Sequence, residues 1–277
     1  MKRIVKITCV LFVAVLLLAG CSGNSAKITE LADLEGKIVA AMSSPQDPEI
    51  LRAVLEQRTD VKFKEMLFYD TVSAAVAALK SGKADAVLVF GPMRDFYISR
   101  DDGLTAVDLP SSGKTTLHMA LRASDAELRD RIDAALLSMR NDGTLASLEK
   151  EFVADLTPDK QLTGKDMPKF DGAPKLTVGL SGETPPVDYV AADGKPAGYN
   201  VELLALLSEA LQVNFELNVM PMESKFPALA SNKIDLFFLH AVNANIEMTI
   251  KTLEANNSAT ITEPYYEYDV TGYLVLK

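Results

Sequence analysis

Polar side chains that could contact a small molecule follow the apolar runs of this sequence. Ser43 and Ser44 come after one such run and just before a predicted helix, where they favour either ligand contacts beside the helix amides or simple helix capping. His240 ends another apolar run, and its imidazole can donate or accept a hydrogen bond, although a lone histidine more often has a structural role. Asn243 and Asn245 follow as further polar contacts or as turn residues. These residue types predict ligand binding.

The same residue types do not predict catalysis. His118 and His240 are the two histidines and lie far apart in the sequence, and no Cys-His, Ser-His-Asp or metal-ligating spacing occurs. We therefore predict no catalytic residue, no metal site and no cofactor.

The elements that must position these side chains alternate between short apolar runs and amphipathic segments. Strands separated by helices indicate α/β architecture with mainly parallel sheets. Because ligands bind beyond the carboxyl ends of such strands, the residues just after positions 42, 90, 180 and 239 are candidate contacts. The predicted strands are 37–42, 61–68, 84–90, 175–180, 213–219 and 234–239, and the predicted helices are 48–58, 71–80, 124–153 and 200–211.

Two segments of the chain echo each other. ALKSGKADAVLVF (78–90) and ALASNKIDLFFLH (228–240) align without gaps and share Ala, Leu, Ser, Lys and Asp at matching positions. Each pattern indicates a helix, a turn and a buried strand. Two such units can share these constraints by chance, but the echo also favours two similarly built lobes.

The N-terminus predicts export. Residues 1–20 combine a cationic start, an apolar run too short to span a bilayer comfortably and small residues before Cys21, which together indicate a signal peptide. Leu-Ala-Gly-Cys resembles the lipobox of bacterial lipoproteins, which implies that the Cys21 thiol carries the lipid. An ordinary signal peptide with Cys21 as a stray thiol is the alternative. Residues 21–33 then form a lipidated tether on the extracytoplasmic side, in the periplasm or on the cell surface.

The charge of the chain narrows the range of partners. The 277 residues carry a net charge of −10. Removing the three basic residues of the signal peptide leaves 25 basic against 38 acidic residues in 21–277. This excess of acidic residues argues against binding to nucleic acid and against electrostatic binding to anionic lipid. We therefore expect the lipid on Cys21 to attach the protein to the membrane. We expect a monomer.

The C-terminal part resembles family 3 extracellular solute-binding proteins, the amino-acid-binding group of ABC importers. The opening KLTVGLSGETPPVDYVAADGKPAGYNVELLALLSEAL (175–211) has the family's first strand, Pro-Pro turn, tyrosine (Tyr189), glycine hairpin and Gly-aromatic motif leading into a helix. FPALASNKIDL (226–236) and TEPYYEYDVTGYLVLK (262–277) resemble the next landmarks in order. The resemblance implies a two-lobed fold of the type II periplasmic-binding-protein kind, with a hinge between the lobes.

The earlier part of the chain resembles the later half of the same family, so the order is rotated. This order is expected of a circular permutation, although half of each partner of a tandem pair would give it too. The rotated order implies that lobe two comes first, at 34–113, followed by helices that return to lobe one, at 114–155. A linker at 156–174 then leads into the strand-first half of lobe one at 175–277.

The resemblance also implies three ligand contacts, and the sequence departs from all of them. The position of the family's ammonium-binding Asp falls at Phe90, that of its carboxylate-binding Arg at Glu247, and that of its stacking aromatic at Thr184. These three residues and Tyr189 are nevertheless candidate ligand contacts. An α-carboxylate without a charge partner is costly to bury. We therefore expect a ligand other than a free amino acid bound in the usual way. Tyr265, Tyr266 and Tyr268 resemble hinge aromatics and are expected to pack.

The predicted function is delivery of a small-molecule ligand to an ABC permease. A sensing or degenerate binding lipoprotein without transport is the main alternative. A dehydratase acting on arogenate or prephenate, a reaction known in a few relatives of this fold, is a further alternative.

Overall fold

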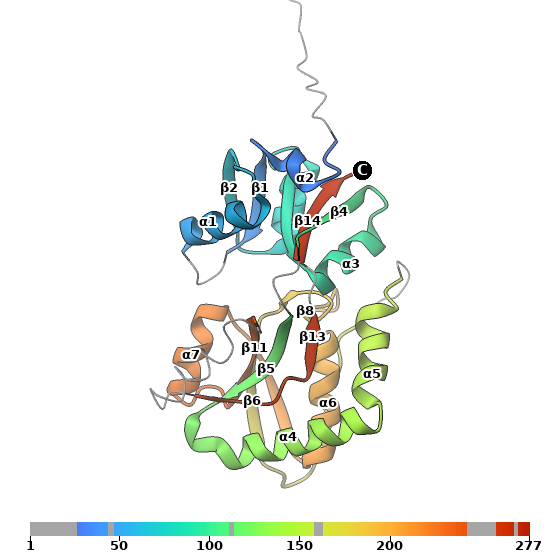
Figure 1. The fold of residues 1–277 in the computed structure, drawn as a ribbon. Coiled ribbons are helices and arrows are strands. Elements are labelled where there is room, and N and C mark those ends of the chain that lie inside the picture. The colour runs from blue at the N-terminus through green and yellow to red at the C-terminus, as the bar shows by residue number, and fades with distance from the viewer. Residues whose placement is uncertain (1–26, 44–46, 111–113, 158–162, 243–258, 269–270) are drawn as a thin grey trace, which may run out of the picture.

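The computed structural model describes residues 27–43, 47–110, 114–157, 163–242, 259–268 and 271–277. They form two lobes, each built around its own sheet with helices packed against it (Figure 1). The two-lobed α/β fold expected from the sequence is therefore confirmed.

Lobe two is built on five strands in the order β2-β1-β3-β14-β4. β1 is parallel to β2 and β3, whereas β14 is antiparallel to β3 and β4. Helix α1 starts where the Asp47 side chain accepts from the first amides, and Thr71 caps α2 in the same way. The elements are η1 (Leu31–Leu34), β1 (Ile38–Met42), α1 (Pro48–Thr59), β2 (Glu65–Tyr69), α2 (Val72–Lys80), β3 (Ala86–Phe90), α3 (Gly91–Arg100), β4 (Leu104–Asp108) and β14 (Thr271–Leu276).

Lobe one repeats this plan. Its sheet has the order β10-β6-β11-β5-β12, with β13 also paired to β5, and a small sheet β7-β8-β9 lies beside it. β10 and β11 are parallel to β6, and β5 is antiparallel to β11. The elements are β5 (Thr115–Leu121), η2 (Ala123–Asp125), α4 (Ala126–Asn141), α5 (Thr144–Glu149), η3 (Lys150–Ala154), β6 (Lys175–Leu180), β7 (Glu183–Thr184), β8 (Asp188–Val190), β9 (Pro196–Ala197), α6 (Tyr199–Leu211), β10 (Asn214–Val219), α7 (Met222–Ala230), β11 (Leu236–Val242), β12 (Thr260–Ile261) and β13 (Tyr266–Tyr268).

Two crossings between the lobes lie side by side. The chain leaves lobe two after β4 and enters lobe one at β5, and it returns from β13 to β14. The Leu109 amide donates to the Thr271 carbonyl at 2.8 Å, and Lys114 forms an ion pair with Glu267. Each sheet therefore receives its antiparallel inner strand directly after a crossing from the other lobe.

The echo in the sequence corresponds to equivalent structure. Asp85 and Asp235 each precede the third parallel strand of their sheet, and each clamps the central strand through two hydrogen bonds. The Ile38 amide donates to Asp85 Oδ2 at 2.8 Å and the Asp85 amide to the Ile38 carbonyl at 2.8 Å. Thr177 and Asp235 form the same pair of bonds at 2.7 Å each. The expectation of two similarly built lobes is confirmed.

Two boundaries expected from the sequence are wrong. Residues 115–121 form strand β5 rather than helix, because a strand buried along nearly its whole length lacks the alternation that distinguishes strands from helices. Residues 271–276 lie in the sheet of lobe two, although the sequence placed the whole of 175–277 in lobe one. An apolar run does not encode which of two sheets it joins.

The linker is held by lobe one. The Phe170 amide donates to the Asn214 side chain at 2.8 Å, and Asn214 Nδ2 donates back to the Phe170 carbonyl at 2.9 Å. The Lys165 amide donates to the Pro196 carbonyl, and the Lys165 ammonium pairs with Glu202. The described part of the linker, 163–174, therefore stays on one lobe.

The tyrosines near the second crossing pack in the core, as expected. Tyr265 and Tyr266 are buried, and Tyr265 stacks on Tyr199 with ring centroids 6.0 Å apart. The Tyr265 hydroxyl donates to the side-chain oxygen of Asn200 at 2.8 Å. Among the described residues, no helix is long and apolar enough to cross a membrane.

His118 in β5 makes the stability of lobe one sensitive to acid. Its Nδ1 lies 2.7 Å from the Thr262 carbonyl and must donate to it, so Nε2 accepts from the Thr116 hydroxyl at 2.8 Å. Burial lowers the pKa of His118 below 6.5, against opposing effects of the Thr262 bond and the Glu263 carboxylate. The unfolded chain therefore takes up a proton before the folded chain does, and the free energy of unfolding should fall as pH drops below 6.5. Urea unfolding at several pH values measures this slope, which should be shallower in His118→Asn. Equal slopes in the two proteins would contradict the assignment.

Candidate functional site

The two lobes meet where helix α3 of lobe two contacts the β7-β8 hairpin of lobe one (Figure 1). The rings of Phe96 and Tyr189 lie 6.0 Å apart between centroids, and the Arg100 guanidinium lies 4.0 Å from the Phe96 centroid. Burial, with a smaller contribution from Glu183 of lobe one, raises the pKa of Tyr97. Because α3 directly follows β3 and the hairpin directly follows β6, the carboxyl ends of both strands lie on the sides where the lobes meet.

A polar cluster with two buried charged residues occupies the carboxyl end of β6. It consists of Ser181, Asp188 and Lys225, and we call it the Lys225 cluster. The carboxylate of Asp188 accepts from the Ser181 amide at 2.8 Å and from the Gly182 amide at 3.0 Å, which fixes the turn after β6. The Lys225 ammonium donates to Ser181 Oγ at 2.7 Å. The cluster offers an ammonium, a hydroxyl and a carboxylate, which are groups for binding rather than for nucleophilic chemistry.

The burial of this cluster shifts its ionisation. Burial lowers the pKa of Lys225 to about 8, while the nearby Asp188 carboxylate acts in the opposite direction. Burial raises the pKa of Asp188, against the attraction of Lys225 and the two backbone amides. Each charge in the pair is thus stabilised by the other and disfavoured by its surroundings.

Three predicted contacts lie where the lobes meet, with different exposure. Phe90 ends β3 and is 38% exposed, so its ring is accessible at that edge. Tyr189 is partly buried against Phe96. Thr184 is buried, and its hydroxyl donates to the Asp188 carbonyl at 3.0 Å. This bond holds the hairpin together, and a role of Thr184 as a ligand contact stays a prediction.

Of the remaining predicted residues, Ser43 and His240 lie in the described part of the chain. Ser43 is exposed at the end of β1, and its amide donates to the Tyr69 carbonyl at 2.8 Å. The capping alternative does not apply to Ser43, because Asp47 caps α1. His240 lies in β11 opposite Leu117. Five predicted positions lie outside the described residues, namely Cys21, Ser44, Asn243, Asn245 and Glu247.

Sequence reasoning missed Lys225, Asp188 and Phe96. Lysine and aspartate are almost never fully buried, so neither was expected in a cluster inside the lobe. A signal was present for Lys225, because it precedes the buried Ala228 and Leu229 by three and four residues and so shares the apolar face of α7. The contact of Phe96 with Tyr189 depends on how the lobes meet and leaves no local pattern.

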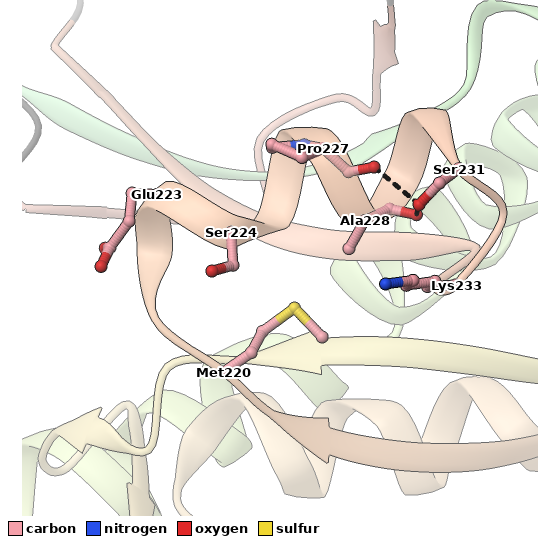
Figure 2. A pocket seen from close by; sticks show the side chains of 7 residues that line it. All are labelled: Met220, Glu223, Ser224, Pro227, Ala228, Ser231 and Lys233. Carbon is pink, nitrogen blue, oxygen red and sulfur yellow. Dashed lines mark hydrogen bonds between the residues drawn. The ribbon is translucent and has the colours of Figure 1, made fainter.

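A hollow on lobe one lies beside the helix that carries Lys225. Figure 2 shows it beside α7, lined by Met220, Glu223, Ser224, Pro227, Ala228, Ser231 and Lys233. The Ser231 hydroxyl already donates to the Pro227 carbonyl at 2.8 Å. All lining residues come from a short stretch of lobe one, so the hollow is a surface depression rather than a site between the lobes. The described residues hold no cluster of metal-ligating side chains.

Two family models match the chain, one in its C-terminal part and one in its N-terminal part. Residues 176–276 match the model of bacterial extracellular solute-binding proteins, family 3. The chain carries a family 3 solute-binding segment. Residues 12–110 match the family described as NMT1/THI5 like. The family 3 segment contains β7, β8 and the whole Lys225 cluster, so the cluster and the hairpin that meets lobe two belong to the recognised part.

Solved structures similar to the chain include binding proteins and ligand-binding cores. A ligand-binding component of an ABC-type import system from Staphylococcus aureus has 10% identity and a TM-score of 0.44, over 87% of this chain and 66% of that protein. The GluR0 ligand-binding core in complex with L-glutamate has 10% identity and a TM-score of 0.45, over 87% and 85%. An ancestral arginine-binding protein bound to arginine has 12% identity and a TM-score of 0.44, over 88% and 86%.

Proposed function

We propose that this protein binds a small solute between its two lobes, outside the cytoplasm, and delivers it to an ABC importer. The observation that carries the proposal is the family 3 match over 176–276, the segment that supplies the hairpin meeting lobe two. The two adjacent crossings support it, because lobes joined at one edge can open and close around a ligand.

The protein is held at the membrane by lipid on Cys21. The cationic start, the apolar run and the Leu-Ala-Gly-Cys sequence support this assignment. The rest of the chain is acidic and would be repelled by anionic lipid, which supports the lipid on Cys21 as the means of attachment. The permease is a partner implied by the family.

The chain is a circular permutant of the family order. Strands β1 to β4 of lobe two come first, β5 to η3 follow in lobe one, and β6 opens the family 3 segment only afterwards. The repeated sheet plan supports a single complete pair of lobes, because each sheet takes its antiparallel strand from across the junction.

The ligand is not a free amino acid bound in the usual family manner. Phe90, rather than an aspartate, ends β3 where the resemblance implies an ammonium contact. The Thr184 hydroxyl is committed to the hairpin where a stacking aromatic is implied.

A thermal-shift screen of the mature protein tests the function. A ligand that binds only the folded state stabilises it and so raises the melting temperature. At a ligand concentration of 100 times the dissociation constant, the added free energy of unfolding is about 2.7 kcal/mol. We expect at least one solute to do so and to show saturable binding by calorimetry. Micromolar binding of a common amino acid would refute the statement about the ligand. A protein that binds no small solute in a broad screen would instead fit the alternative of a degenerate lipoprotein.

A further inference from the structure

Lys225 is an unusual residue for the interior of a lobe. Its side chain has no exposed surface, and it lies on the face of α7 that packs into the lobe. Lysine is found fully buried almost only where a partner compensates its charge. The surroundings of its ammonium group therefore show whether the compensation is complete.

The ammonium group is incompletely satisfied by the described residues. It carries three N–H donors, and the described structure fills one of them, through Ser181 Oγ at 2.7 Å. The Phe237 ring centroid lies 5.9 Å away and offers only a weak attraction. Asp188 is near enough to attract the charge, yet its oxygens bind the amides of Ser181 and Gly182, and no described carboxylate forms an ion pair with Lys225.

The position of the group relates it to the contact between the lobes. Ser181 directly follows β6 and is only partly buried. Asp188 begins β8, and the next residue, Tyr189, contacts Phe96 of lobe two. Lys225 thus contacts the turn that leads from β6 into the hairpin that lobe two touches.

We infer that Lys225 is the anion-binding group of the solute site and that the ligand carries one carboxylate, whose oxygens take the remaining donors of Lys225 beside Ser181. The inference rests on the proposed function, which it deepens by naming the charged group of the solute. The Asp188 carboxylate nearby opposes a second negative charge, so the ligand is a monoanion rather than a dianion. Because the ammonium is covered in this structure, the side chains above it must move when the acid group enters.

The test pairs Lys225→Met with Lys233→Met, which removes an exposed lysine three residues after the same helix ends. Thermal shift and calorimetry use matched acids and amides, namely benzoate with benzamide, phenylacetate with phenylacetamide, and nicotinate with nicotinamide, followed by wider sets of monocarboxylates and neutral or cationic solutes. We expect an acid, and not its amide, to stabilise the native protein and Lys233→Met. Lys225→Met should bind that acid about 10- to 100-fold more weakly.

The melting temperature of the free proteins shows whether Lys225 also has a structural role. Lys225→Met leaves the buried Asp188 carboxylate without its nearby positive charge, so this variant should melt lower than the native protein, and acid binding is therefore compared at a temperature at which all three proteins are folded. Unchanged acid binding in Lys225→Met, or hits confined to neutral or cationic solutes, would overturn the inference while leaving the proposed function intact. If no solute of any class bound the native protein, both would fail together.

Discussion

Replacing Gly198 with alanine is expected to destabilise lobe one by about 3–5 kcal/mol. Gly198 has φ of 108° and ψ of 178°, a conformation that residues with a side chain rarely adopt. A Cβ atom there would lie 2.5 Å from the Pro186 carbonyl oxygen and 2.7 Å from that of Val187. These carbonyls cannot retreat easily, because they accept from the amides of Tyr199 and Asn200 at 3.0 and 2.8 Å. Urea unfolding of the variant measures the loss.

Gly194→Ala is the matched control for this change. Gly194 also has a positive φ, of 80°, but no atom lies within 4 Å of the position of an added Cβ. This variant should lose only about 1–2 kcal/mol, the cost of the left-handed conformation itself. Similar losses in the two variants would mean that the close approach of the Pro186 and Val187 carbonyls has little energetic weight.

Local patterns in the sequence were sufficient to locate most elements of the parallel sheets. The predicted strand 37–42 is β1 at 38–42, and the predicted helix 48–58 is α1 at 48–59. Such segments carry their own signals, since capping residues and apolar spacing act within a few positions. β5 and β14 were misassigned because their places depend on partners far along the chain. The sheet that each of these strands joins is determined by the strands that lie beside it in the folded protein, which are distant in sequence.

The site was less predictable than the fold for a related reason. The position of Phe90 at the edge of its sheet was predictable because the end of a buried strand marks that edge, whereas its role as a ligand contact stays a prediction. Thr184 is a candidate by family position alone, and the hydrogen bond of its hydroxyl to the Asp188 carbonyl depends on how the hairpin turns. Lys225 carried the helical spacing of a core residue together with the chemistry of a surface residue. Such a conflict between spacing and residue type is the signal of a functional position that one sequence can provide.

The echo between the lobes leads to a second large effect. Asp235→Ala should cost about 2–4 kcal/mol, whereas Asp85→Ala should cost about 1–2 kcal/mol. Both changes leave a backbone amide of the central strand, Thr177 or Ile38, without its acceptor. Asp235 has an additional partner, because the Arg122 guanidinium donates to its Oδ1 at 2.7 Å.

The comparison of the two variants separates the aspartate–amide bond, which both lobes have, from the ion pair with Arg122, which only Asp235 has. Arg122 is also held by the Ile234 carbonyl and by the Asp125 carboxylate, each at 2.7 Å, so the guanidinium stays in place when the Asp235 carboxylate is removed and loses one of its two charge partners. Urea unfolding followed by circular dichroism gives both losses, and the double variant Arg122→Met with Asp235→Ala should recover part of the difference. Equal losses at the two positions would mean that the ion pair with Arg122 is too exposed to contribute. In that case the strand clamp common to both lobes would account for the whole effect of each aspartate.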